Sequence, residues 1–175
     1  RSDLRSILKD AVFLREMGNS HVAFHKDLGE VPLTGLFDAR MLGQAFGNLI
    51  KNAVEAIEAL PPDVSREERK VLVRAMADDA GRRFVVDVVD NGKGLPTENR
   101  HRILEPYMTM REKGTGLGLA IVKKIIEDHG GQLELHDAPA DFDHGHGAMI
   151  RVILPYEETV AADADNKSKE MSHGV

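Results

Sequence analysis

Residues 114–131, GTGLGLAIVKKIIEDHGG, form the most informative stretch of the chain. Three glycines alternate with Thr115 and Leu117, and an apolar-periodic helix follows. Glycine leaves the backbone bare, so peptide N–H groups can approach an anion closely. The helix adds its own unpaired N–H groups and the positive end of its dipole at the same place. The pattern therefore predicts a cradle for phosphate.

The composition is that of one globular domain with an acidic balance. The chain has 175 residues, a formal net charge of −6 and no cysteine, which excludes disulfides and thiolate metal sites. No broad basic footprint indicates nucleic-acid binding, and no apolar run reaches the length of a membrane span. The first residues, RSDLRSILKD, lack a signal-peptide pattern and an initiator methionine. We expect a cytoplasmic fragment of a longer protein, without direct membrane contact, whose membrane anchor, if there is one, lies outside it.

Hydrophobic periodicity predicts the order helix, strand, helix, hairpin, long polar segment, helix, strand, strand. The helices are expected at 3–17, at 38–60 and after the glycines, and the strands at 21–27, 70–76, 84–88, 133–135 and 148–154. Helices do not alternate one-for-one with strands, which disfavours a doubly wound parallel sheet. We predict an α/β fold, a two-layer sandwich of one mixed sheet with helices on one face. Residues 1–156 would form this domain, with a lid at 92–114, and residues 157–175 a disordered tail.

The predicted helix at 38–60 carries two asparagines on the stripe opposite its apolar face. At about 100° per residue, Asn48 and Asn52 fall near Gln44 and Glu55 on one side of the helix. Asparagine is unfavourable within a helix because its side chain competes for backbone hydrogen bonds. Amide oxygens suit Mg²⁺, which is usually shared between waters and nucleotide phosphates. These residues alone leave a magnesium site and a plain solvated face equally open.

Residues 90–95, DNGKGL, follow a strongly apolar strand. On these residues alone, a simple Asx or glycine turn is the better interpretation. In a nucleotide site, the Asp90 carboxylate would accept a hydrogen bond from an exocyclic amine such as that of adenine. Gly92 and Gly94 would let a flat base lie close to the backbone, and Leu95 would pack on its face.

The polar segment before the glycines contains residues that suit a closing loop. Tyr107 would be an apolar latch, and Arg111 and Lys113 lie close in sequence to the proposed phosphates. The planar guanidinium of Arg111 matches phosphate oxygens. We predict Arg111 as the catalytic residue, because it would steady charge on a transferring phosphoryl group. A solvated charge run is the alternative.

Fingerprints of other nucleotide-binding folds are absent. The chain has no GxxxxGK[ST] P-loop, no Rossmann glycines directly after a strand and no protein-kinase motif set. Instead, four segments occur in order: NLIKNAVEAI (48–57), DNGKGL (90–95), EPYMTMREKGTGLGLAIVKKIIEDHGG (105–131) and GHGAMIRVILP (145–155). This set resembles the ATP-binding catalytic domain of bacterial sensor histidine kinases, in the GHKL ATPase superfamily. In the sequence of its motifs it is most similar to the nitrogen-regulation sensors, particularly the NtrY-like ones.

The resemblance implies ATP and Mg²⁺ as ligands and a role for each matched residue. Asn48 would bind the magnesium ion, Asn52 would reach phosphate or complete the metal's surroundings, and Asp90 would bind the adenine amine. The base pocket would be shaped by Gly92, Gly94 and Leu95, and the lid would contribute Tyr107, Arg111 and Lys113. The triphosphate would be wrapped by Gly114, Thr115, Gly116, Leu117 and Gly118.

Departures from the family pattern bear on the reaction. Tyr107 stands where the family usually has Phe, and Arg111 stands where nitrogen-regulation relatives usually have Lys. Gln44 stands where the ATP-hydrolysing relatives carry Glu. An amide cannot deprotonate water, so Gln44 fits a kinase that transfers the phosphoryl group rather than one that hydrolyses ATP.

The phosphoacceptor implied by the resemblance is not in this chain. None of the eight histidines stands in an H-E-[IL]-[KR]-N-P context. We expect transfer of the γ-phosphoryl group to a histidine on a separate helical dimerisation domain that precedes Arg1. A response regulator would be a partner of the full-length protein. His144 and His146 lie close together, but no third zinc ligand is evident.

Two other functions remain open. An anti-sigma-type serine kinase of the same superfamily would use an acidic residue in the asparagine helix, which Gln44 disfavours and Glu55 keeps open. A nucleotide-sensing regulatory module would bind ATP and signal through the position of its lid, without transfer. Labelled ATP mixed with a phosphoacceptor-helix fragment would distinguish transfer from sensing.

Overall fold

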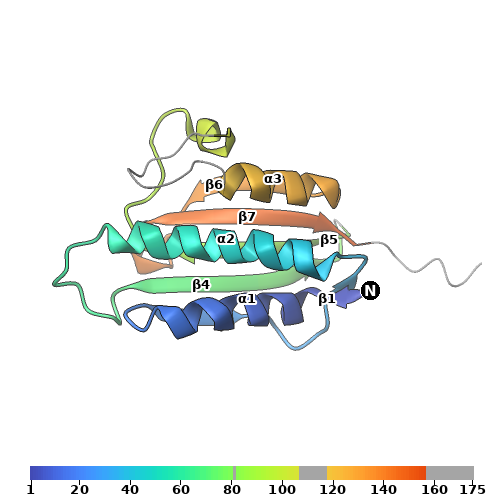
Figure 1. Cartoon of the computed structure of the whole chain (residues 1–175), viewed down its shortest axis with the longest axis horizontal. Helices are drawn as coiled ribbons and strands as arrows, with labels where there is room; N and C mark the ends of the chain where they lie inside the picture. Colours follow the sequence, from blue (N-terminus) through green and yellow to red (C-terminus); the bar gives the residue numbers. More distant parts are fainter. Residues whose placement is uncertain (81, 107–117, 157–175) are drawn as a thin grey trace, which may run out of the picture.

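The computed structural model describes residues 1–80, 82–106 and 118–156. Its centre is a five-stranded mixed sheet in the order β2-β4-β5-β7-β6 (Figure 1). β2 (Ala23–Asp27) runs parallel to β4 (Lys70–Asp78). The other strands are β5 (Arg83–Asp90), β7 (Ala148–Pro155) and β6 (Gln132–Asp137). The pairs β4–β5, β5–β7 and β7–β6 are all antiparallel. The predicted hairpin is β4–β5.

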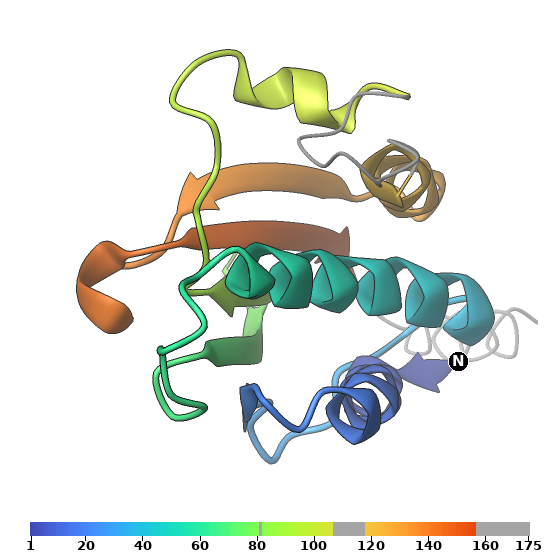
Figure 2. The ribbon, with the colours of Figure 1, turned by 60° about the vertical axis from the view of Figure 1, so that its left-hand side comes forward.

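Three helices cover one face of the sheet. α1 (Leu4–Gly18), α2 (Ala39–Glu58) and α3 (Gly118–Asp128) lie side by side with α2 in the middle (Figures 1 and 2). No helix of the described ranges lies on the opposite face, so the predicted two-layer sandwich is confirmed. Four short elements were not predicted: the antiparallel pair β1 (Ser2–Asp3) and β3 (Thr34–Gly35), and the 3-10 helices η1 (Arg100–Leu104) and η2 (Asp143–Gly145).

Sequence signals at the helix ends act through hydrogen bonds. Asp3 and Asp38 are the N-caps of α1 and α2, and each side chain accepts a backbone N–H of the first turn at 3.0 Å, which satisfies a free donor. α2 ends at Glu58, two residues short of the predicted end. Beyond it, the buried guanidinium of Arg69 donates to the carbonyl oxygen of Ile57 at 3.0 Å. The Leu60 N–H donates to the same oxygen at 2.9 Å, so Arg69 adds a second donor at the end of the helix.

The hydrophobic core lies between the helices and the sheet. The residues on the apolar face of α2 are all buried, namely Leu42, Phe46, Leu49, Ala53 and Ile57. On the sheet they meet alternate residues of the three central strands, among them Val71, Val73, Val86, Val88, Val152 and Leu154. The helical and strand periodicities of these segments are therefore confirmed by burial.

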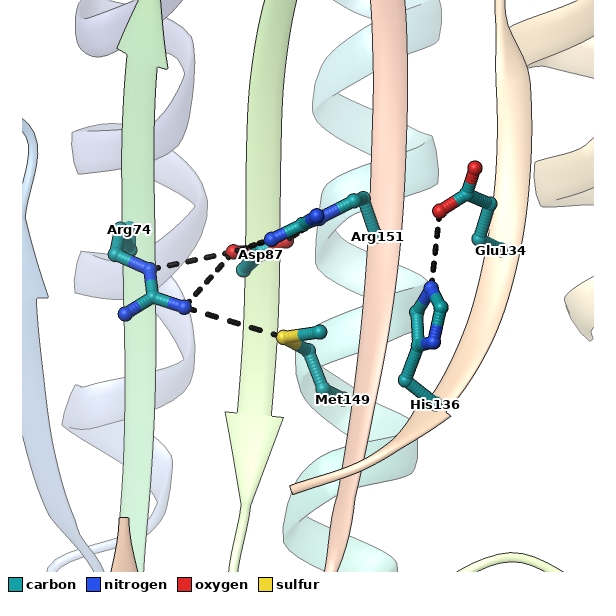
Figure 3. Close-up of polar contacts among 6 residues, drawn as sticks. All are labelled: Arg74, Asp87, Glu134, His136, Met149 and Arg151. Carbon is teal, nitrogen blue, oxygen red and sulfur yellow. Dashed lines mark hydrogen bonds and ion pairs between the residues drawn. The ribbon is translucent and has the colours of Figure 1, made fainter. Parts of the chain in front are cut away.

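A row of charged residues, one from each strand, crosses the helix-free face. In strand order, this charged row consists of Asp27, Arg74, Asp87, Arg151 and Glu134. Each residue is the direct register partner of the next, so the sign of charge alternates across the whole sheet. The Asp87 side chain is 0% exposed and accepts hydrogen bonds from both arginines at 2.8 to 3.2 Å (Figure 3).

The two arginines keep Asp87 ionised despite its burial. Burial raises the pKa of Asp87, but the hydrogen bonds and charges of Arg151 and Arg74 outweigh this and hold the pKa below its usual value. The hydrogen bond to Asp87 in turn raises the pKa of Arg151. A buried charge compensated in this way becomes costly as soon as one partner is removed.

We expect Asp87→Asn to lower the free energy of unfolding at neutral pH by about 3 kcal/mol, because both arginines lose their charged partner. Asp78→Asn, which weakens the more exposed Asp78–Arg83 ion pair (2.8 Å), should cost less than about 1 kcal/mol. Urea denaturation measures both losses. Because the pKa of Asp87 is lowered, its stabilisation is present above the unfolded pKa and is lost as pH falls through the folded one. Equal losses in the two variants would contradict this role of the charged row.

Candidate functional site

Asp90 ends β5 between its register partners Val71 of β4 and Ala148 of β7. The residue is 6% exposed, and its Oδ1 accepts the Gly92 N–H at 2.9 Å. An ionised carboxylate offers about four lone-pair positions, so the surrounding backbone donors leave acceptor capacity. The turn predicted at this position is therefore built around a buried carboxylate that can accept a further hydrogen bond.

The Asp90 carboxyl has a strongly perturbed acidity. Burial raises its pKa to about 7, although hydrogen bonds from the backbone of Gly92 and Ala148 act in the opposite direction. Both protonation states are therefore populated near neutral pH. Desolvated titratable groups of this kind are concentrated at functional sites.

The turn after β5 is packed directly against α2. A β-carbon at Gly92 would overlap the carbonyl group of Ala56 and the amide nitrogen of Ile57. The Lys93 N–H donates to the Ala56 carbonyl oxygen at 3.1 Å. Close approach to the helix is thus one reason for glycine at position 92, and its role in a base pocket stays a prediction.

Asn48 and Asn52 lie on α2 and are half-buried, whereas Gln44 is exposed. On the same helix, Lys51 Nζ and Glu55 Oε1 are 3.9 Å apart. Asn52 precedes, by one helical turn, the part of α2 that contacts the turn after β5. The fold therefore places the asparagine-bearing part of α2 and the Asp90 turn on adjoining elements, although they are far apart in sequence.

Asn91, which the sequence interpretation left without a role, ties three segments together. Its side chain is buried, and its Oδ1 accepts the Lys70 N–H at 2.8 Å at the start of β4. Its Nδ2 donates to the Glu68 carbonyl oxygen and, at 3.2 Å, to Asp143 Oδ2. All three partners are more than 20 residues away in sequence. The sequence therefore offers only one sign of this role, a polar residue directly after an apolar strand.

Gly147 closes the other side of the turn. Its φ is +112°, and a β-carbon there would overlap the Asp90 carbonyl oxygen and Asn91 Cα. Gly94 has a φ of +80° and lies opposite the carbonyl group of Gly147. Both positions therefore require a conformation that glycine adopts without steric cost.

The described beginning of the predicted lid is attached to the sheet. Arg100 Nε donates to the Pro96 carbonyl oxygen, and Arg100 Nη2 pairs with Asp137 at the end of β6, both at 2.6 Å. Leu95 is partly buried, and Gly118 begins α3. The other predicted lid and glycine-loop residues lie outside the described residues: Tyr107, Arg111, Lys113, Gly114, Thr115, Gly116 and Leu117.

Two other features of the described residues bear on ligands. In 1–80, 82–106 and 118–156, no three His, Cys, Asp or Glu side chains are grouped to hold a metal ion. A cavity of about 430 Å³ is lined by His21, Glu58 and Arg66 among others, and no predicted site residue lines it.

Among the described residues, no helix has both the length and the apolar character to cross a membrane.

Comparison with known proteins identifies the family. Residues 37–158 match the family described as histidine kinase-, DNA gyrase B-, and HSP90-like ATPase. The chain belongs to this ATPase family. The matched region contains α2, the Asp90 turn and β7, so all predicted site residues of the ATPase domain fall within it.

Relatives of this ATPase domain include nitrogen-regulation proteins. The chain is 48% identical over 169 residues to nitrogen regulation protein NtrY of Azorhizobium caulinodans, which covers 95% of the chain and 21% of that protein. It is 40% identical over 123 residues to sensory histidine kinase/phosphatase NtrB of Rhodobacter capsulatus, which covers 69% of the chain and 33% of that protein. The chain thus spans only a fifth to a third of the length of these relatives.

Solved structures share the fold of the ATPase domain. The mycobacterial sensor histidine kinase MprB matches with a TM-score of 0.73 and 28% identity, covering 88% of this chain and 95% of that one. Full-length ShkA in complex with AMPPNP matches with a TM-score of 0.70 and 28% identity, covering 89% of this chain and 30% of that one. The α/β sandwich predicted from the sequence is therefore that of histidine kinase catalytic domains.

In the ATPase domain, we expect Asp90→Asn to remove a pH dependence of stability. The folded-state pKa of about 7 lies above the ordinary value of 3.8, so between these values the folded domain keeps a proton that the unfolded chain has released. Wild-type stability should therefore fall, relative to the variant, by on the order of 2 kcal/mol between about pH 5 and about pH 8. Urea denaturation of both proteins across this range measures the difference. A difference that does not change with pH would refute the raised pKa.

Two glycines of one loop provide a matched test of the close packing around Asp90. Gly147→Ala should destabilise the domain by at least about 3 kcal/mol, because strain and overlap with Asp90 add. Gly145→Ala also places alanine at positive φ (+79°), but its β-carbon would have contacts of 3.5 Å or more, and it should cost about 1 kcal/mol. Thermal unfolding of the two variants measures both losses. Similar stability of the two variants would show that Gly147 does not need to approach Asp90.

Proposed function

We propose that this chain is the ATP-binding catalytic domain of an NtrY-like sensor histidine kinase. Its reaction would transfer the γ-phosphoryl group of ATP to a histidine on a separate helical domain. The observation that carries the proposal is the buried Asp90 carboxylate, held in a glycine turn that packs on the asparagine-bearing helix α2. The similarity to NtrY, 48% identity that extends over 95% of the chain, supports the kinase class.

Asp90 would recognise the base of the nucleotide. Its carboxylate is desolvated and keeps acceptor capacity, so it would accept a hydrogen bond from the exocyclic amine of adenine. The ShkA structure, similar over 89% of this chain, is of a complex with AMPPNP, which carries the same base. Gly94 and Leu95 would line the space beside the base.

Asn48 would hold Mg²⁺ together with waters and phosphate oxygens. The donor set fits this ion, because Mg²⁺ is commonly bound by few protein oxygens and shared with nucleotide phosphates. Asn52 would reach phosphate, and residues 114–118 would wrap the triphosphate with backbone N–H groups. When bound, the ion would neutralise phosphate charge.

The residues favour phosphoryl transfer over hydrolysis. Gln44, on the exposed side of α2, cannot act as a general base toward water. An imidazole acceptor is itself a nucleophile, so transfer to histidine needs no strong base from this domain. The serine-kinase alternative is disfavoured by Gln44, while Glu55, its acidic candidate, pairs with Lys51 at 3.9 Å. Arg111 would steady the charge of the transferring group.

Partners and location follow from this class. The phosphoacceptor would belong to the helical dimerisation domain of the same kinase, and a response regulator would receive the phosphoryl group from the full-length protein. The names NtrY and NtrB connect the relatives with nitrogen regulation. We place residues 1–156 as the catalytic domain, in the cytoplasm where ATP is available.

Labelled ATP tests the reaction. This chain, mixed with the separately produced helical phosphoacceptor domain of an NtrY-like kinase, γ-³²P-ATP and Mg²⁺, should yield acid-labile, base-stable label on the acceptor histidine. Asp90→Asn should lower the labelling by at least about tenfold, because its one amide oxygen would have to accept both the Gly92 N–H and the adenine amine, and one well-aligned hydrogen bond is lost. A His→Ala acceptor should remain unlabelled.

The outcomes separate the alternatives. Nucleotide binding without any label on the acceptor would support the regulatory module and overturn transfer. Label that is stable in acid, on a serine of an added protein, would support the serine-kinase alternative. Calorimetry with and without Mg²⁺ checks the metal assignment, since Asn48→Ala should weaken binding of Mg·ATP more than binding of ATP in chelator.

A further inference from the structure

The loop of residues 143–147, which has no role in the proposed function, contacts both residues of the Asp90–Asn91 pair. Asp143 Oδ2 accepts a hydrogen bond from Asn91 Nδ2 at 3.2 Å. Four residues later, Gly147 lies so close that a β-carbon would overlap the Asp90 carbonyl oxygen. One loop thus touches the side chain of one residue and the backbone of the other.

The backbone of this loop has positive φ angles at four of its five residues. φ is +45° at Asp143, +59° at His144, +79° at Gly145 and +112° at Gly147. Positive φ is unfavourable for residues other than glycine, although aspartate tolerates it better than most. Such conformations persist only where surrounding contacts determine them, and they are concentrated at functional sites. Here the contacts at both ends of the run are with Asp90 and Asn91.

We infer that Asp143 is a positioning residue for adenine recognition, acting through Asn91 on the turn that presents the Asp90 carboxylate. This inference rests on the proposed function of Asp90. Asn91 is held from the β4 side by Lys70 and Glu68, and Asp143 supplies its contact from the side of the η2 loop. Asn91 in turn is bonded to Asp90 and precedes Gly92, whose N–H donates to the Asp90 carboxylate.

Asp143 affects the position of the Asp90 turn more than the stability of the domain. If its carboxylate is removed, Lys70 and Glu68 still hold the Asn91 side chain, and the pairing of β5 with β4 and β7 is unchanged. We therefore expect the change to be confined to the position of the turn of residues 90–92 relative to the 143–147 loop. A misplaced carboxylate weakens a directional hydrogen bond while leaving contacts to the triphosphate intact, so the effect should depend on the base.

The test compares ATP with ITP, which has an oxygen in place of the exocyclic amine. Asp143→Gly removes the carboxylate without adding strain at positive φ. We expect it to weaken ATP binding about tenfold and ITP binding by less than about twofold. Asp143→Asn keeps an acceptor oxygen and should retain wild-type selectivity. Asp141→Gly, at an exposed position two residues before Asp143, is the matched control and should leave both affinities unchanged.

Calorimetry gives the affinities, and the amide resonance of Gly92 reports the turn directly. That resonance should shift in Asp143→Gly and not in Asp141→Gly, in protein without nucleotide. If Asp143→Gly does not fold, Asp143→Glu moves the carboxylate by one methylene and should show the same loss of selectivity. Equal weakening of ATP and ITP, or an unmoved Gly92 resonance, would overturn the inference. A wild-type chain that does not distinguish ATP from ITP would instead overturn the proposed role of Asp90.

Discussion

The buried carboxylate of Asp87 fixes the register of the sheet, and the site depends on that register. Side chains alternate between the two faces of a strand, so a slip of β5 by one residue would move Asp87 toward the helices and away from both arginines. Asp90 lies three residues later on the same strand and faces the other way, toward α2. The ion pairs of Asp87 on the helix-free face of the sheet therefore determine the position of Asp90 on the face that the helices cover.

Asp87 and Asp90 also show how the surroundings decide the chemistry of one residue type. Both are buried on β5, yet the pKa of Asp87 is lowered and that of Asp90 is raised to about 7. Two guanidinium groups compensate the burial of the first, whereas only backbone N–H groups oppose the burial of the second. The first carboxylate is satisfied by the protein itself, and the second keeps capacity for a partner from outside.

Local patterns predicted the elements well, and long-range contacts are what they missed. The spacing of apolar residues predicts the helices, because this signal acts within a few residues, and the structure adds N-caps at Asp3 and Asp38. The two-residue strands β1 and β3 have no such pattern. Asn91 could not be assigned, since its partners come from β4 and from the η2 loop. Gly92 was read as space for a base, yet the structure also shows it against α2, a neighbour that periodicity cannot reveal.

Both ends of the described chain lie at the end of the sheet where β5 begins and β7 finishes (Figure 1), whereas Asp90 is the last residue of β5. Arg83, at the start of β5, pairs with Pro155, and Phe84 stacks on Tyr156 with ring centroids 5.0 Å apart. On the same side, Ser2 Oγ donates to the Phe37 carbonyl oxygen. Covalent connections to neighbouring modules would therefore leave from the side remote from the acidic turn. Such an arrangement lets one unit be joined into longer polypeptides of different design while the junctions stay clear of the turn that holds Asp90.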